Sequence, residues 1–284
     1  MALCSGYDGF TLGLSLAILG YRTVCHVERE TYASAMLVAR MEDGTLPQAP
    51  IWSDIATFCG AGWRGAVDII TAGFPCQPWS CAGQQKGTED DRWVWPDIAR
   101  IIGEVEPGIV FLENVPGLIA GGLGPVLGSL ASLGFDAEWG MFRASDVGAP
   151  HRRERLFILA HRDRDRLAQL REGWLHERKN PRGHDTDGCN TDVEHADGNG
   201  RGPRELPIAA CAALTGAEGR GRAFPPGPDD YEGWRAALPA TQPAICGVAH
   251  GPTNRVGELR ACGNGVVPAV VALAFITLAR RAME

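Results

Sequence analysis

One stretch decides the fold of this chain: Val67-Asp68-Ile69-Ile70-Thr71-Ala72-Gly73-Phe74-Pro75-Cys76-Gln77-Pro78. Its apolar first half predicts a buried strand that ends at about Gly73, and two prolines then stiffen the loop that follows. Cys76 lies between those prolines, just past the carboxyl end of the strand. A lone cysteine is usually a small buried hydrophobe. In an open α/β sheet, however, ligands bind at this edge, so the position suits a nucleophilic thiolate.

The beginning of the chain has the pattern of a nucleoside-binding unit. A short strand at 2–4 leads into the turn Ser5-Gly6-Tyr7-Asp8-Gly9, and the apolar run Phe10–Leu19 predicts a helix. A second strand, Thr23–Val27, ends at Glu28, about 20 residues past the glycines, where Rossmann-like folds place a ribose-binding carboxylate. The spacing favours a nucleoside cofactor but does not separate a dinucleotide from S-adenosylmethionine.

Strands and helices alternate through the rest of the first 160 residues. The apolar patterns predict helices at 31–41, 93–103 and 118–133, and strands at 51–55, 108–114, 135–142 and 156–160, with 135–142 an outer strand. From about residue 161 glycine, proline and charged residues dominate, and a last apolar helix is expected at 270–278. The fold class is therefore α/β, with a doubly wound sheet and a smaller loop-rich region.

Three charged residues have the setting of a catalytic site. Glu113 ends the strand expected next to the Cys76 loop, and burial there would raise the pKa of its carboxyl and suit it to proton donation. Arg153 and Arg155 alternate before the strand at 156–160, so both should face the same way. The plainer interpretation makes all three solvated charges.

Four blocks resemble those of the bacterial and phage DNA (cytosine-5)-methyltransferases. They are Gly73–Ser80, Glu113-Asn114-Val115, the Arg-x-Arg at 153–155, and Gly263-Asn264-Gly265-Val266-Val267-Pro268. The resemblance implies a methyltransferase of the Rossmann-like, S-adenosylmethionine-dependent class with a mixed sheet. It also implies a catalytic and cofactor-binding domain at 1–160 plus 258–284, and a target-recognition region at 161–257.

The resemblance assigns a role to each matched position. As catalytic residues it implies the nucleophile Cys76, the carboxyl Glu113 that protonates cytosine nitrogen 3, and Arg153 and Arg155 at the flipped nucleotide. For S-adenosylmethionine, which would leave as S-adenosylhomocysteine, the implied residues are Ser5, Gly6, Tyr7, Gly9, Glu28, Arg29, Asp54, Ile55, Gly73, Phe74, Pro75, Asn264 and Val266. For DNA they are Gln77, Ser80, Gln84, Gln85 and Asn114.

This chain departs from the family pattern at three places in the expected cofactor site. Cys4 and Asp8 stand where an aromatic residue and a glycine are common, and Arg29 stands where a residue that packs on adenine is common. Asp54 has an alternative as an ordinary N-cap residue, a position that aspartate favours.

Composition limits what else the protein can be. The net charge of −7 over 284 residues means that any contact with double-stranded DNA must come from a local basic cluster. No apolar run is long enough to span a membrane and no signal-peptide pattern is present. Nine cysteines without a C-x-x-C pair suggest reduced thiols and no zinc site, and the histidines and acids at 184–195 match no metal-ligand spacing. We therefore expect a cytoplasmic monomer without metal, in a bacterial or phage-infected cell, with a companion restriction endonuclease as a candidate partner.

Three alternatives stay open at this point. An RNA (tRNA) cytosine-5 methyltransferase of the same fold is one, although its relatives usually show Pro-Pro-Cys instead of Phe74-Pro75-Cys76. A catalytically inactive DNA-binding homologue is the second. A nicotinamide-dependent dehydrogenase is the third, because the glycine turn and Glu28 alone allow it. The recognised DNA sequence cannot be predicted.

Overall fold

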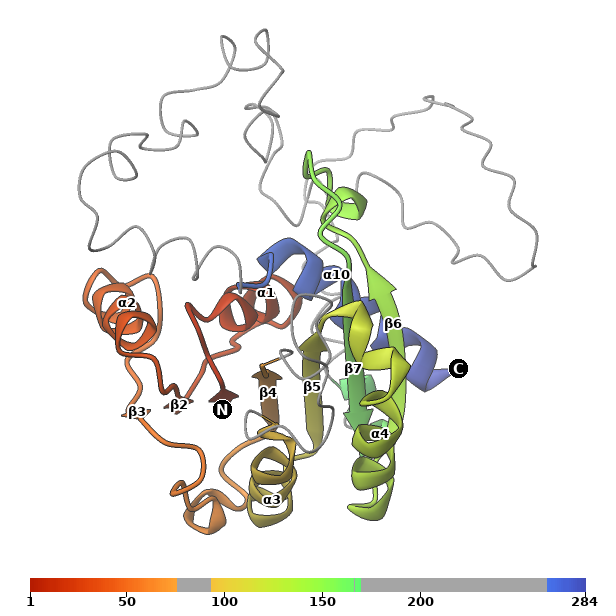
Figure 1. Cartoon of the computed structure of the whole chain (residues 1–284), viewed down its shortest axis with the longest axis horizontal. Helices are drawn as coiled ribbons and strands as arrows, with labels where there is room; N and C mark the ends of the chain where they lie inside the picture. The colour runs from red at the N-terminus through yellow and green to blue at the C-terminus, as the bar shows by residue number, and fades with distance from the viewer. Residues whose placement is uncertain (76–92, 166, 170–264) are drawn as a thin grey trace, which may run out of the picture.

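The computed structural model describes residues 1–75, 93–165, 167–169 and 265–284, and Figure 1 draws the remainder as a grey trace. The described residues form one seven-stranded sheet with the strand order β3-β2-β1-β4-β5-β7-β6. The strands are β1 (Ala2–Leu3), β2 (His26–Val27), β3 (Ile51–Trp52), β4 (Ile69–Gly73), β5 (Ile109–Asn114), β6 (Asp136–Phe142) and β7 (Arg155–His161). The predicted α/β class is confirmed.

Helices cover both faces of the sheet, as Figure 1 shows. The α-helices are α1 (Gly9–Ala17), α2 (Thr31–Glu42), α3 (Trp95–Val105), α4 (Leu123–Ser132) and α10 (Pro268–Met283), with short 3₁₀ turns η1 (Ala61–Trp63), η4 (Pro116–Ala120) and η5 (Ala144–Val147). Helices α1 and α10 pack together on one face, and α3 and α4 cover the other.

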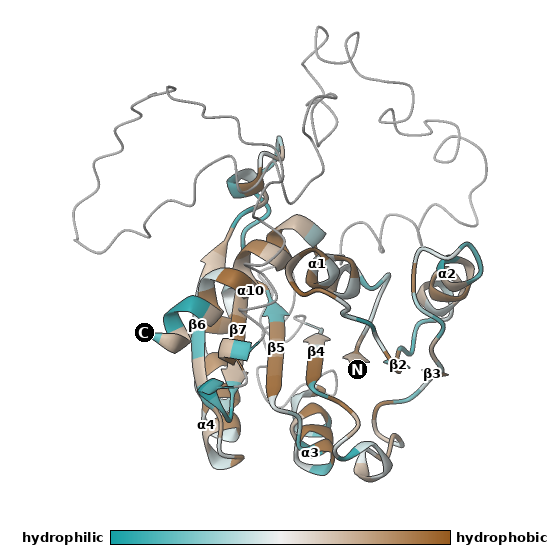
Figure 2. Ribbon diagram, turned by 180° about the vertical axis from the view of Figure 1, so that it is seen from behind, coloured by the Kyte–Doolittle hydropathy of each residue, from teal (hydrophilic) through white to brown (hydrophobic). Residues whose placement is uncertain are grey.

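Strand β5 lies at the centre of the hydrophobic core. Phe111 points to the α1–α10 side and packs edge-on against Phe275 of α10, whereas Val110 and Leu112 belong to the cluster under α3 and α4. Successive side chains of a strand point to opposite faces, so a strand buried on both faces must be apolar along its length. The central strands β4 and β5 accordingly appear brown over most of their length in Figure 2.

The strand directions bring several chain segments to one edge of the sheet. β1, β2, β3, β4 and β5 run parallel, while β7 pairs antiparallel with both β5 and β6. The start of β7 therefore lies beside the end of β5, whose other neighbour is the end of β4. The order also reverses between β1 and β4, and such a switch point is where open α/β sheets bind ligands.

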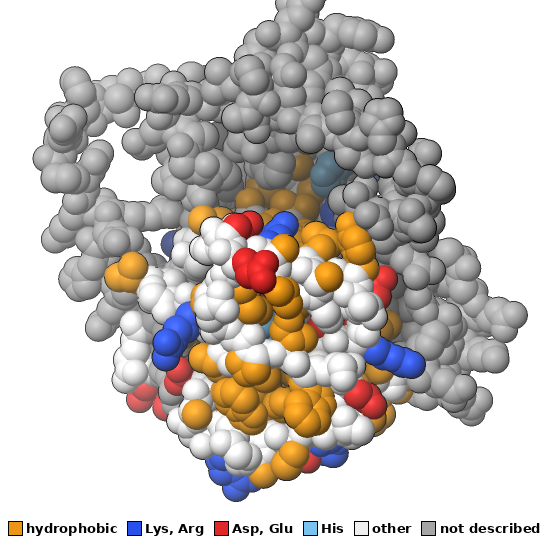
Figure 3. All heavy atoms as spheres, turned by 90° about the vertical axis from the view of Figure 1, so that its left-hand side faces the viewer, with side chains coloured by type: hydrophobic (Ala, Val, Ile, Leu, Met, Phe, Trp, Pro, Cys, Tyr) orange, Lys and Arg blue, Asp and Glu red, His pale blue; other side chains and the backbone are white. Residues whose placement is uncertain are grey.

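The edge formed by β3 and α2 faces the viewer in Figure 3, where hydrophobic side chains lie exposed among charged ones. Trp52 of β3 and Val38 of α2 are among the large hydrophobic residues that remain exposed.

Three elements are shorter than the sequence predicts. The predicted strand at 51–55 ends at Trp52, because the chain turns when the Asp54 carbonyl accepts the Thr57 amide. Only the last two residues of the strand predicted at 23–27 pair with neighbours. The predicted helix at 118–133 is divided by Gly121 and Gly122 into η4 and α4.

Candidate active site

Glu113 is the buried acid of the site. It lies at the end of β5, in register with Gly73 of β4 and Phe157 of β7, and is only 8% exposed. Its Oε1 forms an ion pair with Nε of Arg155 at 3.0 Å. An ionised carboxylate buried in this way needs a partner, and the first residue of β7 supplies one.

Burial sets the protonation of this acid. Desolvation raises the pKa of Glu113 from 4.5 to about 7, against the opposing attraction of Arg155 and Arg153. A carboxyl with such a pKa is protonated in a large fraction of molecules near neutral pH, so it can donate a proton. The expectation that Glu113 is poorly solvated is confirmed.

Asn114 fixes the beginning of the loop that carries Cys76. Its Nδ2 donates to the carbonyl of Phe74 at 3.2 Å, and its Oδ1 accepts the amide of Val115 at 2.9 Å. The Phe74 ring is buried against Trp93 and Trp95, with centroids 5.9 and 5.6 Å away. The chain therefore leaves β4 in a fixed direction, with Pro75 exposed at the end of the described segment.

Arg153 lies just before β7, close enough to Glu113 to lower the pKa of that carboxyl. Its backbone has a φ of 34°, which a residue with a side chain rarely adopts. The guanidinium donates to the carbonyl of Gly265, and so it contacts the segment that enters α10. Both arginines thus act on Glu113, although Arg153 lies outside the strand and its left-handed backbone breaks the predicted strand alternation.

The glycine turn and Glu28 lie side by side at the other half of the edge. The Gly6 amide donates to Oε2 of Glu28 at 2.7 Å, and the Glu30 amide donates to Oε1 at 2.8 Å. The pairing of β1 with β2 continues past Leu3, because the Ser5 amide donates to the Val27 carbonyl. Gly6 has a φ of +55°, and a Cβ built on it would meet no heavy atom within 4 Å. The turn therefore presents open backbone beside a fixed carboxylate.

Asp8 has a structural role that the sequence did not reveal. It adopts a left-handed conformation with φ 59° and caps α1, because its Oδ1 accepts the Thr11 amide at 3.1 Å. Its Oδ2 lies 3.7 Å from Nδ1 of His26, and both side chains are buried. Burial raises the pKa of Asp8 and lowers the pKa of His26, while their mutual attraction opposes both changes. The sequence signal that could have predicted this cap is the Asp-x-x-Thr spacing of Asp8 and Thr11 at the start of α1.

The C-terminal segment closes against the glycine turn. The Tyr7 hydroxyl donates to the Val266 carbonyl, and the Arg40 guanidinium of α2 lies 5.4 Å from the centre of the Tyr7 ring. A Cβ on Gly9 would lie 2.5 Å from the Val266 carbonyl oxygen, so only glycine permits this approach. Val266 thus lies against the glycine turn.

Asp54 and Ile55 follow β3 in a tight turn. Oδ1 of Asp54 accepts the Ala56 amide at 3.0 Å, an arrangement of a turn and not of a helix N-cap. Asp54 is exposed and Ile55 is half-buried. Arg29, which follows Glu28, is exposed.

Six predicted site residues lie outside the described residues: Cys76, Gln77, Ser80, Gln84, Gln85 and Asn264. The same holds for all but the beginning of the expected target-recognition region, 161–257. In the described ranges, no helix has the length and apolarity to cross a bilayer. Within the same ranges, no three histidine, cysteine or acidic residues are grouped in a way that could bind a metal ion.

Similar proteins of known type match just over half of the chain. A Type II methyltransferase, M.NgoMIV of Neisseria gonorrhoeae, is 32% identical over 164 residues, which are 56% of this chain and 50% of that protein. M.PspPI of Psychrobacter is 37% identical over 56% of this chain and 38% of that protein. M.CviJI of a Paramecium bursaria Chlorella virus is 35% identical over 53% and 40%. The chain spans about half, or less, of the length of these relatives.

The family model for the C-5 cytosine-specific DNA methylases matches residues 1–196. That range contains the glycine turn, Glu28, Asp54, the Cys76 loop, Glu113 and both arginines of the site. The chain therefore belongs to the C-5 cytosine-specific DNA methylase family.

Proposed function

We propose that this chain methylates carbon 5 of a cytosine within a specific sequence of double-stranded DNA. The observation that carries the proposal is the buried carboxyl of Glu113, whose pKa is raised to about 7, in register with Gly73. Three residues after Gly73 comes Cys76. An acid and a nucleophile at the ends of neighbouring strands are what addition to a pyrimidine ring requires.

The chemical difficulty is that carbon 5 of cytosine is a weak nucleophile. Addition of the Cys76 thiolate to carbon 6 removes the aromaticity of the ring, and the proton of Glu113 passes to nitrogen 3 as charge develops there. Carbon 5 then has the character of an enamine carbon. After methylation, carbon 5 gives its proton to solvent water, the electrons of that C–H bond expel the Cys76 thiolate from carbon 6, and nitrogen 3 returns its proton to Glu113. The products are 5-methylcytosine and the free thiolate.

The arginines would hold the target nucleotide. A stacked base cannot reach a buried acid, so the cytosine must leave the duplex, at a cost of a few kcal/mol. Arg155 already pairs with Glu113, so it would orient that carboxyl toward the ring. Arg153, next to the segment entering α10, would contact the phosphate or the base.

The residues at the β1–β3 end fit S-adenosylmethionine. Glu28 presents a carboxylate fixed by two amides to ribose hydroxyls, and Asp54 and Ile55 suit the adenine amino group and ring. Ser5, Tyr7, Gly9 and Val266 would line the amino-acid end. When bound, this cofactor supplies an electrophilic methyl group and leaves as S-adenosylhomocysteine.

Other residues would determine which DNA sequence is methylated. Residues 161–257 would form the target-recognition region, and Gln77, Ser80, Gln84 and Gln85 would contact the DNA. Because the similar proteins are named Type II methyltransferases, a companion restriction endonuclease with the same recognition sequence is the partner to seek. Sequencing the methylated sites of a plasmid from an expressing strain would give that sequence.

The first test replaces Cys76 by serine. We expect Cys76→Ser to abolish transfer of a radiolabelled methyl group to DNA, while calorimetry still detects S-adenosylmethionine binding, because only the nucleophile is lost. Full transfer by this variant would contradict the mechanism, and a wild-type chain that transfers no label to any DNA would favour the inactive homologue.

The same assay separates the substrates. A duplex carrying 5-fluorocytosine at the target should become covalently bound to the wild-type protein, since carbon 5 then has no proton to lose. Parallel reactions with tRNA test the RNA alternative. Label in tRNA and none in DNA would overturn the proposal.

A further inference from the structure

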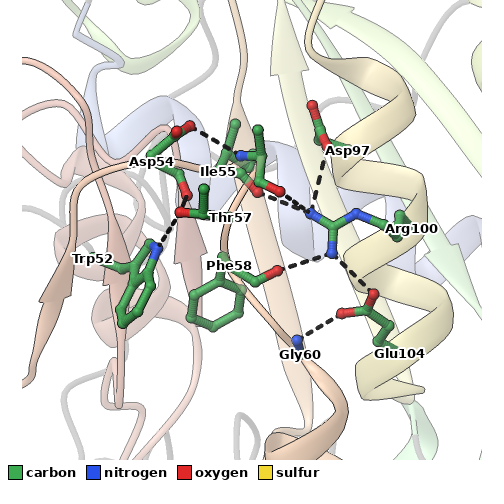
Figure 4. Close-up of polar contacts among 10 residues, drawn as sticks. Trp52, Asp54, Ile55, Thr57, Phe58, Gly60, Asp97, Arg100 and Glu104 are labelled. Atoms are coloured by element: carbon green, nitrogen blue, oxygen red, sulfur yellow. Dashed lines mark hydrogen bonds and ion pairs between the residues drawn. The ribbon is translucent and has the colours of Figure 1, made fainter.

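The Arg100 guanidinium of α3 holds the turn that follows β3. Its Nη1 donates to the Phe58 carbonyl at 2.8 Å, and its Nη2 donates to the Ile55 carbonyl at 2.9 Å. A longer contact, of 3.4 Å, reaches the Ala56 carbonyl. Figure 4 shows the guanidinium between these carbonyls and the acids of its own helix. One side chain from a different element thus binds three backbone carbonyls within four residues.

Two acids of α3 keep Arg100 in this position. Asp97 lies one turn before it at 3.4 Å and Glu104 one turn after it at 2.9 Å, so the guanidinium is held from both sides. Glu104 also binds the segment after β3 directly, because its Oε2 accepts the Gly60 amide at 2.6 Å. That hydrogen bond and Arg100 lower the pKa of Glu104, which therefore stays ionised at neutral pH.

The turn is also fixed from its other side. Nε1 of Trp52 donates to Oγ1 of Thr57 at 3.1 Å, and the Trp52 ring packs edge-on against Phe58. A Cβ built on Gly60 would lie 2.8 Å from Val105, so the chain approaches α3 as closely as glycine allows. The turn is a rigid piece whose orientation depends on α3.

The position of Asp54 follows from this support. Oδ1 of Asp54 accepts the Ala56 amide, so the carboxylate cannot rotate away from the turn without breaking that hydrogen bond. The carbonyl of Ala56 and that of Ile55 are in turn bound by Arg100. The Arg100 guanidinium therefore binds the carbonyls of the two residues that follow Asp54, and the amide of the second of them, Ala56, binds the exposed Asp54 carboxylate.

We propose that Arg100 is a positioning residue for the nucleoside site: it sets the place of Asp54 and Ile55 against the adenine of the cofactor. This inference rests on the proposed function. Arg100 does not itself contact the cofactor in this scheme. Its planar fork can donate to separate carbonyls at once, which the single ammonium group of a lysine cannot reproduce.

The test compares two ligands by calorimetry, without any turnover. One is S-adenosylhomocysteine, and the other is S-inosylhomocysteine, in which a carbonyl oxygen replaces the adenine amino group. We expect the wild type to prefer the first about tenfold or more, because the second leaves Asp54 without its donor. Asp54→Ala should lose this preference. Arg100→Ala should bind S-adenosylhomocysteine about tenfold more weakly than the wild type and lose the preference as well. Arg100→Lys should lie between the wild type and Arg100→Ala in both respects.

The matched control is Arg64→Ala. Arg64 lies at the C-terminal end of α3, where it donates to the Glu104 carbonyl at 3.1 Å and pairs with Glu106 at 3.3 Å. Its loss should leave both affinities unchanged. A general loss of stability would weaken the binding of both ligands by the same factor and leave the preference unchanged. An unchanged preference in both Arg100 variants therefore overturns the inference. A wild type that binds neither ligand contradicts the proposed function, and the inference falls with it.

Discussion

Two opposing effects act on the acid at the end of β5. Glu113 is buried beside Gly73, yet one of its oxygens is paired with Arg155. Desolvation favours the neutral carboxyl and the guanidinium favours the ionised one, and burial is the larger effect. The balance brings the pKa of Glu113 to about 7, so the group can gain and lose a proton near neutral pH.

Stability should therefore depend on pH through Glu113. The native pKa is about 7 and the ordinary value 4.5, so between them the folded chain holds a proton that the unfolded chain releases. This contribution is fully present below pH 4.5 and is lost as the pH rises through 7. Since Glu113→Gln cannot titrate, its free energy of unfolding relative to wild type should change by on the order of 3 kcal/mol across that window.

Urea unfolding of both chains at pH 4.5, 5.5, 6.5 and 8 measures this difference, with the variant becoming relatively more stable at high pH. A difference that is constant over the series would show that Glu113 has an ordinary pKa.

At the residue scale the sequence predicts some side chains well and others not at all. Glu28 and Glu113 could be found because each follows an apolar strand directly, and the end of a strand is readable from the pattern. Arg100 and the pair of Asp8 with His26 could not. Their partners lie in other elements, so their roles depend on packing, although the acids at Asp97 and Glu104 were a local cue.

At the scale of elements, α1 and α10 approach each other through glycine. A Cβ on Gly13 would lie 2.4 Å from the Val271 side chain and 2.6 Å from the Pro268 carbonyl. Contacts of that length force one of the helices to move. The close packing keeps α10, and with it Val266, against the glycine turn.

Gly13→Ala should therefore destabilise the protein by about 1–3 kcal/mol, even though alanine is the better helix former. The control is Gly128→Ala in α4, where a Cβ would meet nothing within 4 Å and the better helix propensity should raise stability by up to about 1 kcal/mol. Chemical unfolding of the two variants measures both effects. Equal behaviour of the two variants would argue against the close helix contact.

Elements differ in how far their lengths could be predicted. The strands β4, β5 and β7 match their predicted ranges within about two residues, because an apolar run buried on both faces has clear limits. The peripheral strands β2 and β3 are shorter than predicted, β3 because the chain turns after Trp52. The division of the predicted helix into η4 and α4 needed the backbone geometry of two glycines.

At the scale of the whole molecule, α10 joins distant parts of the chain into one core. Phe275 is fully buried and packs edge-on against Phe111 at 5.3 Å, and their cluster includes residues of α1, β4, β5, β7 and η5. The described residues 265–284 are thus as central to the core as the first 160. We expect both halves of the sheet to lose structure in one transition.

Phe275→Ala should lower the free energy of unfolding by about 3–5 kcal/mol, because a large cavity forms at the centre of this core. Ile119→Ala, at a side chain that is 43% exposed, should cost far less. Unfolding followed by circular dichroism and by tryptophan fluorescence should give one midpoint for each chain. Two separate midpoints would show that α10 and the sheet unfold independently.

The sense of β7 limits how the chain can be shortened. Its first residue, Arg155, lies at the edge that carries Glu113, whereas its last, His161, pairs with Ile109 and Asp136 at the opposite rim. Gly265 and Val266 lie back at the edge that carries Glu113, against Arg153 and Tyr7. A linker designed to join His161 directly to Gly265 would have to span the height of the sheet, about 20 Å for the six rises from Arg155 to His161, which is too far for a two-residue hairpin turn.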